Sequence, residues 1–270
     1  MIAAFRAEWA KTIRRPRTYV ALGFVMFIPI LVAFLLWLNP PDPGDGDRFF
    51  TTATQTGLLF PAAMLRIMSR LVLVIVVALF AGDAIAGEAN TGNLRYLLLR
   101  PLSRGRLLAS KLAITVLLAV GATVLLTATA TLAGGIAFGF EPLSLQMIFF
   151  VDQSVGNLIG HIGMATAYVA WTLASVVAFG FMVSTMTDSP AGAAGAAAGL
   201  GITSQILVEI ESLGVLRDYL PLRYLDAWEG LFWSNRIPDD MYSGLLLAVP
   251  WTLAFLGIGW WWFHRKDVLA

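Results

Sequence analysis

The chain has 270 residues, of which 58% are hydrophobic and 13% are charged, and its mean hydropathy is +0.77. These values exclude an ordinary soluble globular domain and predict an integral membrane protein. The formal net charge is only +1, and the lack of cysteine excludes disulfides, thiolate metal sites and cysteine nucleophiles.

Residues 1–17 predict an amphipathic helix that lies flat in the membrane interface. Apolar residues recur there at steps of three and four from Ile2 to Ile13, and basic residues stand between them. Such a helix turns its basic face toward anionic head groups. The alternative is a short basic tail that only sets the orientation of the chain. Pro16 is expected to mark the corner between this helix and the first span.

Six segments are apolar enough to cross a membrane, for which a helix needs roughly 20 apolar residues. The first is too long for the apolar core of a signal peptide and is expected to remain as an anchor. With six spans, both termini lie on the same side. In chain order, the predicted spans are 18–38, a segment that starts between 57 and 71 and ends near 86, 112–138, 160–186, 191–210 and 244–263.

Basic residues concentrate on one side of these spans. Five precede the first span, five lie between the second and the third, and two follow the sixth. The loops on the other side contain four, diluted by a larger number of acidic residues. Because loops rich in lysine and arginine stay in the cytoplasm, the sequence predicts a multi-pass protein of the cytoplasmic (inner) membrane with both termini inside.

The loop between the second and third spans, residues 87–111, mixes leucines with basic residues. It predicts a short helix from Gly92 to Leu99, which Pro101 ends and whose leucines share one side. An isolated helix of this length is marginal in water. It therefore needs a partner surface, either the head-group layer or a cytoplasmic protein with an apolar groove and an acidic rim.

The stretch GEANTGNLRYLLLRPLSR, residues 87–104, resembles the cytoplasmic loop of the permease subunits of type-2 ATP-binding-cassette (ABC) exporters. The resemblance covers residues 84–111, and in that family the loop carries a coupling helix that docks on the ATPase subunit. One departure is Asn93, where the family more often has threonine. The residues that the resemblance implies in ATPase coupling are Glu88, Gly92, Leu94, Arg95, Leu97, Leu98, Arg100, Pro101, Ser103 and Arg104.

The resemblance implies that the chain is the membrane subunit of an ATP-driven exporter. Its partners would be an ABC-type ATPase subunit, a second permease copy or sister permease, and membrane lipids, with no nucleic acid. The sequence has no G-x-x-x-x-G-K-[ST] motif, so the chain is not expected to be an enzyme. We expect it to bind no cofactor or metal ion, and ATP and Mg to be used by the partner ATPase. The transported substrate is not specified.

The expected fold is an all-α integral membrane protein with a single permease domain, residues 1–270. It has six transmembrane helices, the N-terminal interfacial helix, the coupling helix between spans two and three, and short external helices before span six. Residues 209–242 predict those external helices, because apolar and aromatic residues recur there at mostly three-residue spacing. They act either as a gate at the exit or as an inert lid.

Charged residues within a span are functional candidates by default. Arg66 and Arg70, near the outer end of the second span, reach either the outer head groups or an anionic substrate or lipid. Asp83 serves at the helix end, contacts the arginines of the loop or faces a cavity. Gly195 and Gly199 predict close helix packing, with a neighbour from the same subunit or from another.

Threonines in the third span predict either a polar translocation path or hydroxyl groups that bond to their own helix. Three other classes of function remain open. The chain could be a membrane anchor or receptor that recruits a cytoplasmic partner through the same loop, a secondary transporter or channel, or a membrane-embedded enzyme acting on lipids. The last has the weakest basis, because the only two histidines lie far apart in the sequence.

Overall fold

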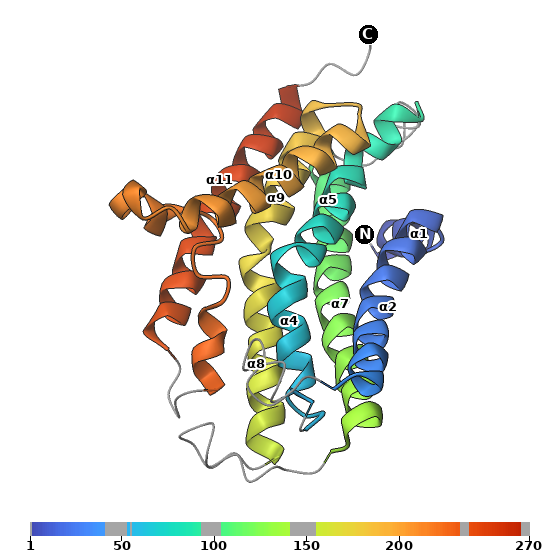
Figure 1. Cartoon of the computed structure of the whole chain (residues 1–270). Coiled ribbons are helices and arrows are strands. Elements are labelled where there is room, and N and C mark those ends of the chain that lie inside the picture. The colour runs from blue at the N-terminus through green and yellow to red at the C-terminus, as the bar shows by residue number, and fades with distance from the viewer. Residues whose placement is uncertain are drawn as a thin grey trace.

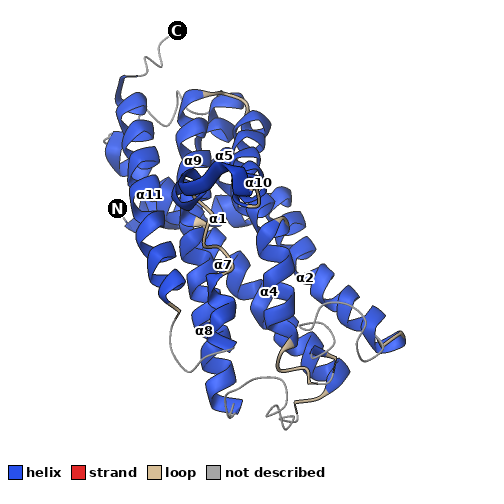
Figure 2. Ribbon diagram, turned by 60° about the vertical axis from the view of Figure 1, so that its left-hand side comes forward, coloured by secondary structure: helices blue, strands red, loops and turns tan. Residues whose placement is uncertain are grey.

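The computed structural model describes the chain as a set of helices (Figure 1). Within the described ranges it contains no strand (Figure 2), which confirms the all-α fold. The described residues are 2–40, 53–54, 56–92, 104–140, 155–232 and 238–265.

The helices follow one another in a simple order. In chain order, they are α1 (Ile2–Ile13), α2 (Pro16–Leu38), α4 (Phe60–Arg70), α5 (Val72–Asn90), α7 (Arg104–Phe138), α8 (Val155–Thr172), α9 (Ala174–Met186), α10 (Pro190–Val208), the 3-10 helices η2 (Glu211–Tyr219) and η3 (Ala227–Phe232), and α11 (Asp239–Arg265). Helices α1, η2 and η3 form in the segments 1–17 and 209–242, where short helices are predicted.

Six helical segments in the described part of the chain are long and apolar enough to cross a membrane, as predicted. They are α2, α5, α7, α8 joined to α9, α10 and α11. Helix α7 has 35 residues and is about 52 Å long, well beyond the roughly 30 Å of a hydrocarbon core. It begins at Arg104 rather than at 112, because the polar turns that precede the apolar run are also good helix formers.

The second span is built from two helices. The apolar α5 begins at Val72, and α4 precedes it with a break at Leu71, whose φ and ψ are −126° and −60°. Helix α4 begins with Pro61 in its first turn, a position that proline favours, and carries Arg66 and Arg70 one turn apart on the same face. The uncertain start of this span therefore corresponds to a real change of helix at Leu71.

Helix α5 lies in the centre of the bundle, packed against α7, α9 and α10. Its closest neighbour is α10, where a Cβ added to Gly82 would lie 2.4 Å from the backbone nitrogen of Ala194. Gly195 and Gly199 are on another face of α10, and nothing described lies within 4 Å of a Cβ added to either. Among the described residues, the structure therefore gives these two glycines no close helix neighbour within the chain.

Helix α1 and the end of α11 each contact the start of α7 at one end of the bundle, where α5 also ends. Lys111 of α7 forms an ion pair with Glu8 of α1, and Arg104 of α7 donates a hydrogen bond to the carbonyl of His264 in α11. We call this the basic end. At the opposite end, the backbone N–H of Gly57, before α4, donates a hydrogen bond to the carbonyl of Gly139, after α7.

Candidate functional site

The predicted coupling loop leaves the bundle at the basic end. Residues 93–103 lie outside the described residues, so the structure describes Glu88, Gly92 and Arg104 of the predicted coupling residues. The others, all outside, are Leu94, Arg95, Leu97, Leu98, Arg100, Pro101 and Ser103.

Helix α5 extends past its predicted end near residue 86 and stops at Asn90. Gly92 then takes a left-handed conformation with φ +70°, the geometry that glycine supplies at the C-terminal end of a helix. The hydroxyl of Thr91 donates to the carbonyls of Gly87 and Glu88, which satisfies acceptors in the last turn. Gly92 therefore closes α5, directly before the segment predicted as the coupling helix.

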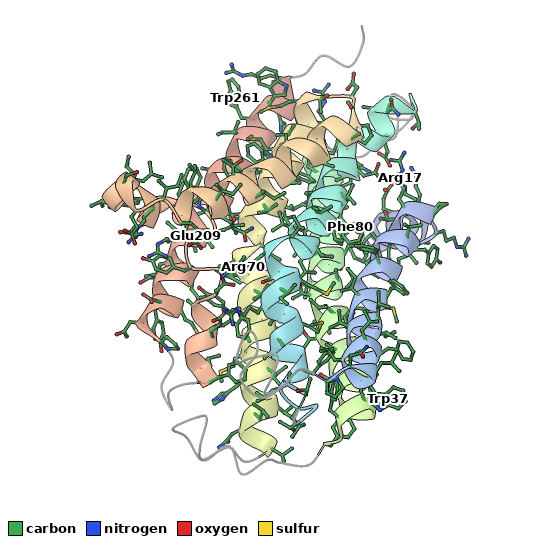
Figure 3. All side chains as sticks on the ribbon, in the orientation of Figure 1. Arg17, Trp37, Arg70, Phe80, Glu209 and Trp261 are labelled. Atoms are coloured by element: carbon green, nitrogen blue, oxygen red, sulfur yellow. The ribbon has the colours of Figure 1, made fainter. Side chains whose placement is uncertain are left out.

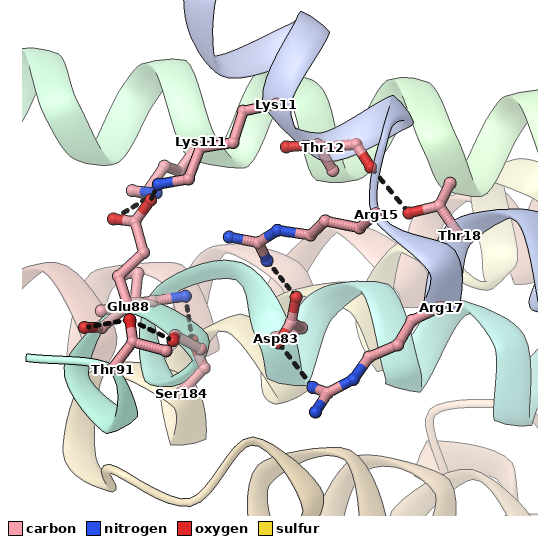
Figure 4. A network of polar contacts seen from close by, with 12 residues as sticks. Lys11, Thr12, Arg15, Arg17, Thr18, Asp83, Glu88, Thr91, Lys111 and Ser184 are labelled. Carbon is pink, nitrogen blue, oxygen red and sulfur yellow. Dashed lines mark hydrogen bonds and ion pairs between the residues drawn. The ribbon is translucent and has the colours of Figure 1, made fainter. Parts of the chain in front are cut away.

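Glu88 lies in the last turn of α5, and its charged side chain is only 1% exposed. Its Oε1 is 2.8 Å from Nζ of Lys11 in α1, and its Oε2 is 2.7 Å from Nζ of Lys111 in α7 (Figure 4). Lys111 also lies 3.3 Å from Glu8. We call Glu8, Lys11, Glu88 and Lys111 the ionic cluster. Its two lysines balance two carboxylates, which is the condition under which charges are tolerated away from water.

Asp83 lies on α5 more than one turn before Glu88 and is bound by two arginines at the α1–α2 corner (Figure 4). Arg15 donates to one carboxylate oxygen, and Arg17 Nη1 lies 3.2 Å from the other. The described partners of Asp83 thus belong to this corner rather than to the loop. The corner is closed by a hydrogen bond from the Thr18 hydroxyl to the carbonyl of Thr12, and α2 begins at Pro16, as predicted.

These contacts tie both ends of the loop to the terminal helices. The end of α5 is held by α1 through Glu88, and the start of α7 is held by α1 through Lys111 and by α11 through Arg104. A force on the loop would therefore reach α1, α5, α7 and α11 together. The site is a junction between these helices.

Sequence reasoning selected Glu88, Asp83 and Arg104 but missed the rest of the ionic cluster. It used Lys11 and Lys111 only to assign the side of the membrane. A usable signal was present, because Glu8 is the only acidic residue in 1–17 and sits one helical turn before Lys11. An acid on an otherwise basic interfacial helix indicates a lysine or arginine partner elsewhere in the fold.

Arg66 and Arg70 form ion pairs with the segment that precedes the last span. Arg66 Nε lies 2.9 Å from Glu229 Oε1, and Arg70 Nη2 lies 2.7 Å from Asp226 Oδ2. Figure 3 labels Arg70, at the end of α4. The predicted contacts of both arginines were head groups or an anionic ligand, and the described partners are instead carboxylates. These pairs fasten η3 and the residues before it to α4, next to Trp228, which is fully buried.

The stability of the protein is expected to fall less with rising pH in Asp226→Asn than in the wild type. Burial raises the pKa of Asp226, more than the nearby Arg70 and Arg66 lower it. The folded state then holds this proton more tightly than the unfolded state, so ionisation lowers the free energy of unfolding as the pH rises from about 4 through the raised pKa. Unfolding titrations of both proteins over this range test the prediction, and a pH-independent difference between them would contradict it.

The threonines of the third span bond to their own helix. The hydroxyls of Thr115, Thr123, Thr127, Thr129 and Thr131 each donate to the carbonyl four residues earlier. One contact also joins helices, since the hydroxyls of Thr127 and Thr166 in α8 are 3.0 Å apart. This pattern favours the alternative in which the threonines are satisfied within the helix.

A relative from Stutzerimonas stutzeri, described as "Probable ABC transporter permease protein NosY", is 26% identical over 202 residues. The alignment covers 72% of this chain and 64% of the relative, so it spans just under two thirds of that protein's length. Residues 26–269 match the family described as "Protein of unknown function (DUF2705)". Since this match extends over nearly the whole sequence, the chain belongs to the DUF2705 family.

Proposed function

We propose that this chain is the membrane subunit of an ABC exporter and that a separate ATPase subunit docks on its 87–111 loop. The observation that carries the proposal is the junction at the basic end, where the two helices that flank the loop are tied to α1 by the ion pairs Lys11–Glu88 and Lys111–Glu8. The resemblance of residues 84–111 to permease loops and the similarity to a probable ABC transporter permease support it.

The loop has the composition of a docking element. Leu94, Leu97 and Leu98 would enter an apolar groove of the ATPase, and Arg95 and Arg100 would face an acidic rim. The chain itself carries no phosphate-binding loop, so MgATP belongs to the partner. With the basic end in the cytoplasm, movement of the ATPase would displace the ends of α5 and α7, and the ionic cluster would carry that displacement to α1 and α2.

A complete transporter would contain a second permease, either another copy of this chain or a sister protein. The open face of α10 around Gly195 and Gly199 supports a close approach by a helix of that second subunit. Transport would be outward, across the cytoplasmic membrane. The segment between α10 and α11, fastened by Arg66 and Arg70, would cover the outer side of the path.

The proposal is tested by purifying the tagged protein from its native membranes in mild detergent and identifying co-purified proteins by mass spectrometry. We expect an ATPase with Walker motifs to accompany the wild type. Leu98→Asp should reduce its recovery about tenfold, because an ionised carboxylate would have to be buried in the apolar groove. Val215→Asp is the matched control, since Val215 is 69% exposed on η2 and far from the loop in the sequence.

Two results would contradict the proposal. Equal recovery of the ATPase with Leu98→Asp and wild type would exclude docking through the loop. If no ATPase appears while other membrane complexes of the same cells survive purification, the exporter assignment fails, and an anchor that recruits another cytoplasmic partner, or a secondary transporter, takes its place.

A further inference from the structure

A large cleft separates α2 from α5 on one side of the bundle, and α7 and α10 contribute further lining residues. Its volume is about 1210 Å³. Arg17 of α2 and Phe80 of α5, both labelled in Figure 3, belong to its lining. The residues that line it are mostly apolar, and several large ones are exposed, among them Phe24 and Phe27, which are 53% and 55% exposed.

The cleft is polar at one end and apolar along its length. Arg17 lies in the first turn of α2, and Phe27 lies ten residues further on, about 15 Å along the helix axis. On the facing wall, α5 runs from Asp83 back to the break at Leu71, about 18 Å. Both distances are close to half of the roughly 30 Å hydrocarbon core, which is the thickness of one leaflet.

The polar end carries an excess of positive charge. Among the lining residues, Glu8 and Lys111 form an ion pair with each other, whereas Arg15 and Arg17 share the single carboxylate of Asp83. One positive charge is therefore left over among these side chains. Arg17 is 75% exposed and has five N–H donors, and Asp83 accepts from only one of its nitrogens.

We propose that this cleft binds a phospholipid with an anionic head group. The head group lies at Arg15 and Arg17, which donate to its phosphate oxygens in the planar geometry that guanidinium groups favour. At least one of its two acyl chains runs along the apolar wall formed by Phe24, Phe27 and Ile75. Basic pockets between transmembrane helices at the cytoplasmic side are suited to such lipids. Lipid binding here requires neither an ATPase nor transport.

The bound lipid would fix the position of α2. This helix packs mainly on α7 and makes few contacts with α5, so the cleft leaves much of the space between α2 and α5 without protein contacts. A phospholipid in that space would connect the α1–α2 corner to α5. This connection would add to the hydrogen bond that Arg17 donates to Asp83.

The first test counts the lipids that stay bound. The purified full chain is reconstituted into vesicles of phosphatidylcholine and phosphatidylglycerol, extracted again in mild detergent and weighed by native mass spectrometry. We expect the wild type to retain phosphatidylglycerol. Arg17→Gln should retain at most about one third of the amount that the wild type retains. Arg265→Gln is the control, because Arg265 is an exposed basic residue of the basic end that does not line the cleft.

A second variant fills the cleft without changing its charge. Gly23 lines the cleft, and nothing lies within 4 Å of a Cβ added there, so Gly23→Leu projects into open space. It should also lower the retained phosphatidylglycerol. Gly121→Leu is the matched control on α7, since Gly121 also has open space beside it but does not line the cleft.

The two pairs of variants decide the proposal. Loss of phosphatidylglycerol in Arg17→Gln and Gly23→Leu, with normal retention in both controls, supports it. Equal retention in all five proteins overturns it. Equal loss of phosphatidylcholine and phosphatidylglycerol in Arg17→Gln overturns the anionic specificity. A change from a larger to a smaller oligomer in Gly23→Leu, with unchanged lipid, shows that a second protein chain fills the cleft and also overturns it.

Discussion

Lys111→Met is expected to lower the free energy of unfolding by about 3 kcal/mol, because it removes one partner from a buried group of charges. Lys111 is 6% exposed and contacts both Glu88, which is 1% exposed, and Glu8. Without it, Glu88 keeps only Lys11, and Glu8 loses its ion pair. The measurement is an equilibrium unfolding titration of the purified protein from a mild into a denaturing detergent.

A double variant separates the loss of charge balance from the loss of packing. Lys111→Met combined with Glu8→Gln leaves one lysine and one carboxylate, the pair of Lys11 and Glu88 at 2.8 Å. We therefore expect the double variant to be more stable than Lys111→Met alone, which corresponds to a favourable coupling between the two positions. Strictly additive losses would contradict an ion pair between Lys111 and Glu8.

The two lysines of the ionic cluster differ in burial, and we expect their contributions to stability to differ in the same order. Lys11 is 42% exposed, so Glu88 keeps its better shielded partner, Lys111, when Lys11 is replaced by methionine. Lys11→Met should therefore cost less than Lys111→Met. If the two variants are equally unstable, burial of the cluster does not determine its contribution to stability.

The six spans could be predicted from the sequence because lipid imposes a one-dimensional requirement, a run of apolar residues long enough to cross the core. The length of an apolar run does not determine the residues at which the helices begin and end. This criterion detects only the part of α7 that is apolar, whereas the helix itself begins at Arg104 among charged residues. Nor could it divide the second span, since the break at Leu71 falls where an amphipathic helix meets an apolar one.

Charged candidates could be found from the sequence, but their partners could not. Asp83, Arg66 and Arg70 stood out because ionisable residues within a span are costly and need a compensating contact, and Glu88 stood out through the resemblance to permease loops. Their partners lie far away in the chain, for example 77 residues apart for Lys11 and Glu88. Such pairs form only when helices are brought together, and helix periodicity in one segment carries no information about them.

The glycine that lets two helices pack closely could not be identified from the sequence either. The sequence draws attention to Gly195 and Gly199 because they are spaced four apart on one face. The glycine at which α5 comes nearest to α10 is Gly82. It lies four residues from both Ala78 and Ala86, so small residues recur on α5 as well, and which of them is essential depends on how near the next backbone is.

Gly82→Ala is therefore expected to destabilise the protein by about 2–3 kcal/mol, the upper part of the range for an overpacked interior. The new Cβ would lie 2.4 Å from the backbone nitrogen of Ala194 and 2.7 Å from its Cα. Backbone atoms cannot rotate away as a side chain can, so α5 and α10 would have to separate along their whole contact. The unfolding titration used for Lys111→Met measures this loss.

Gly121→Ala is the matched control, since it makes the same chemical change inside another spanning helix, α7, where nothing described lies within 4 Å of the new Cβ. It should be neutral or stabilising by up to about 1 kcal/mol, because alanine favours a helix more than glycine does. Gly82→Ala/Ala194→Gly should recover only a small part of the loss, since removing the Cβ of Ala194 leaves its backbone in place. A full recovery would mean that the side chain of Ala194, and not the approach of the two backbones, limits the residue at position 82.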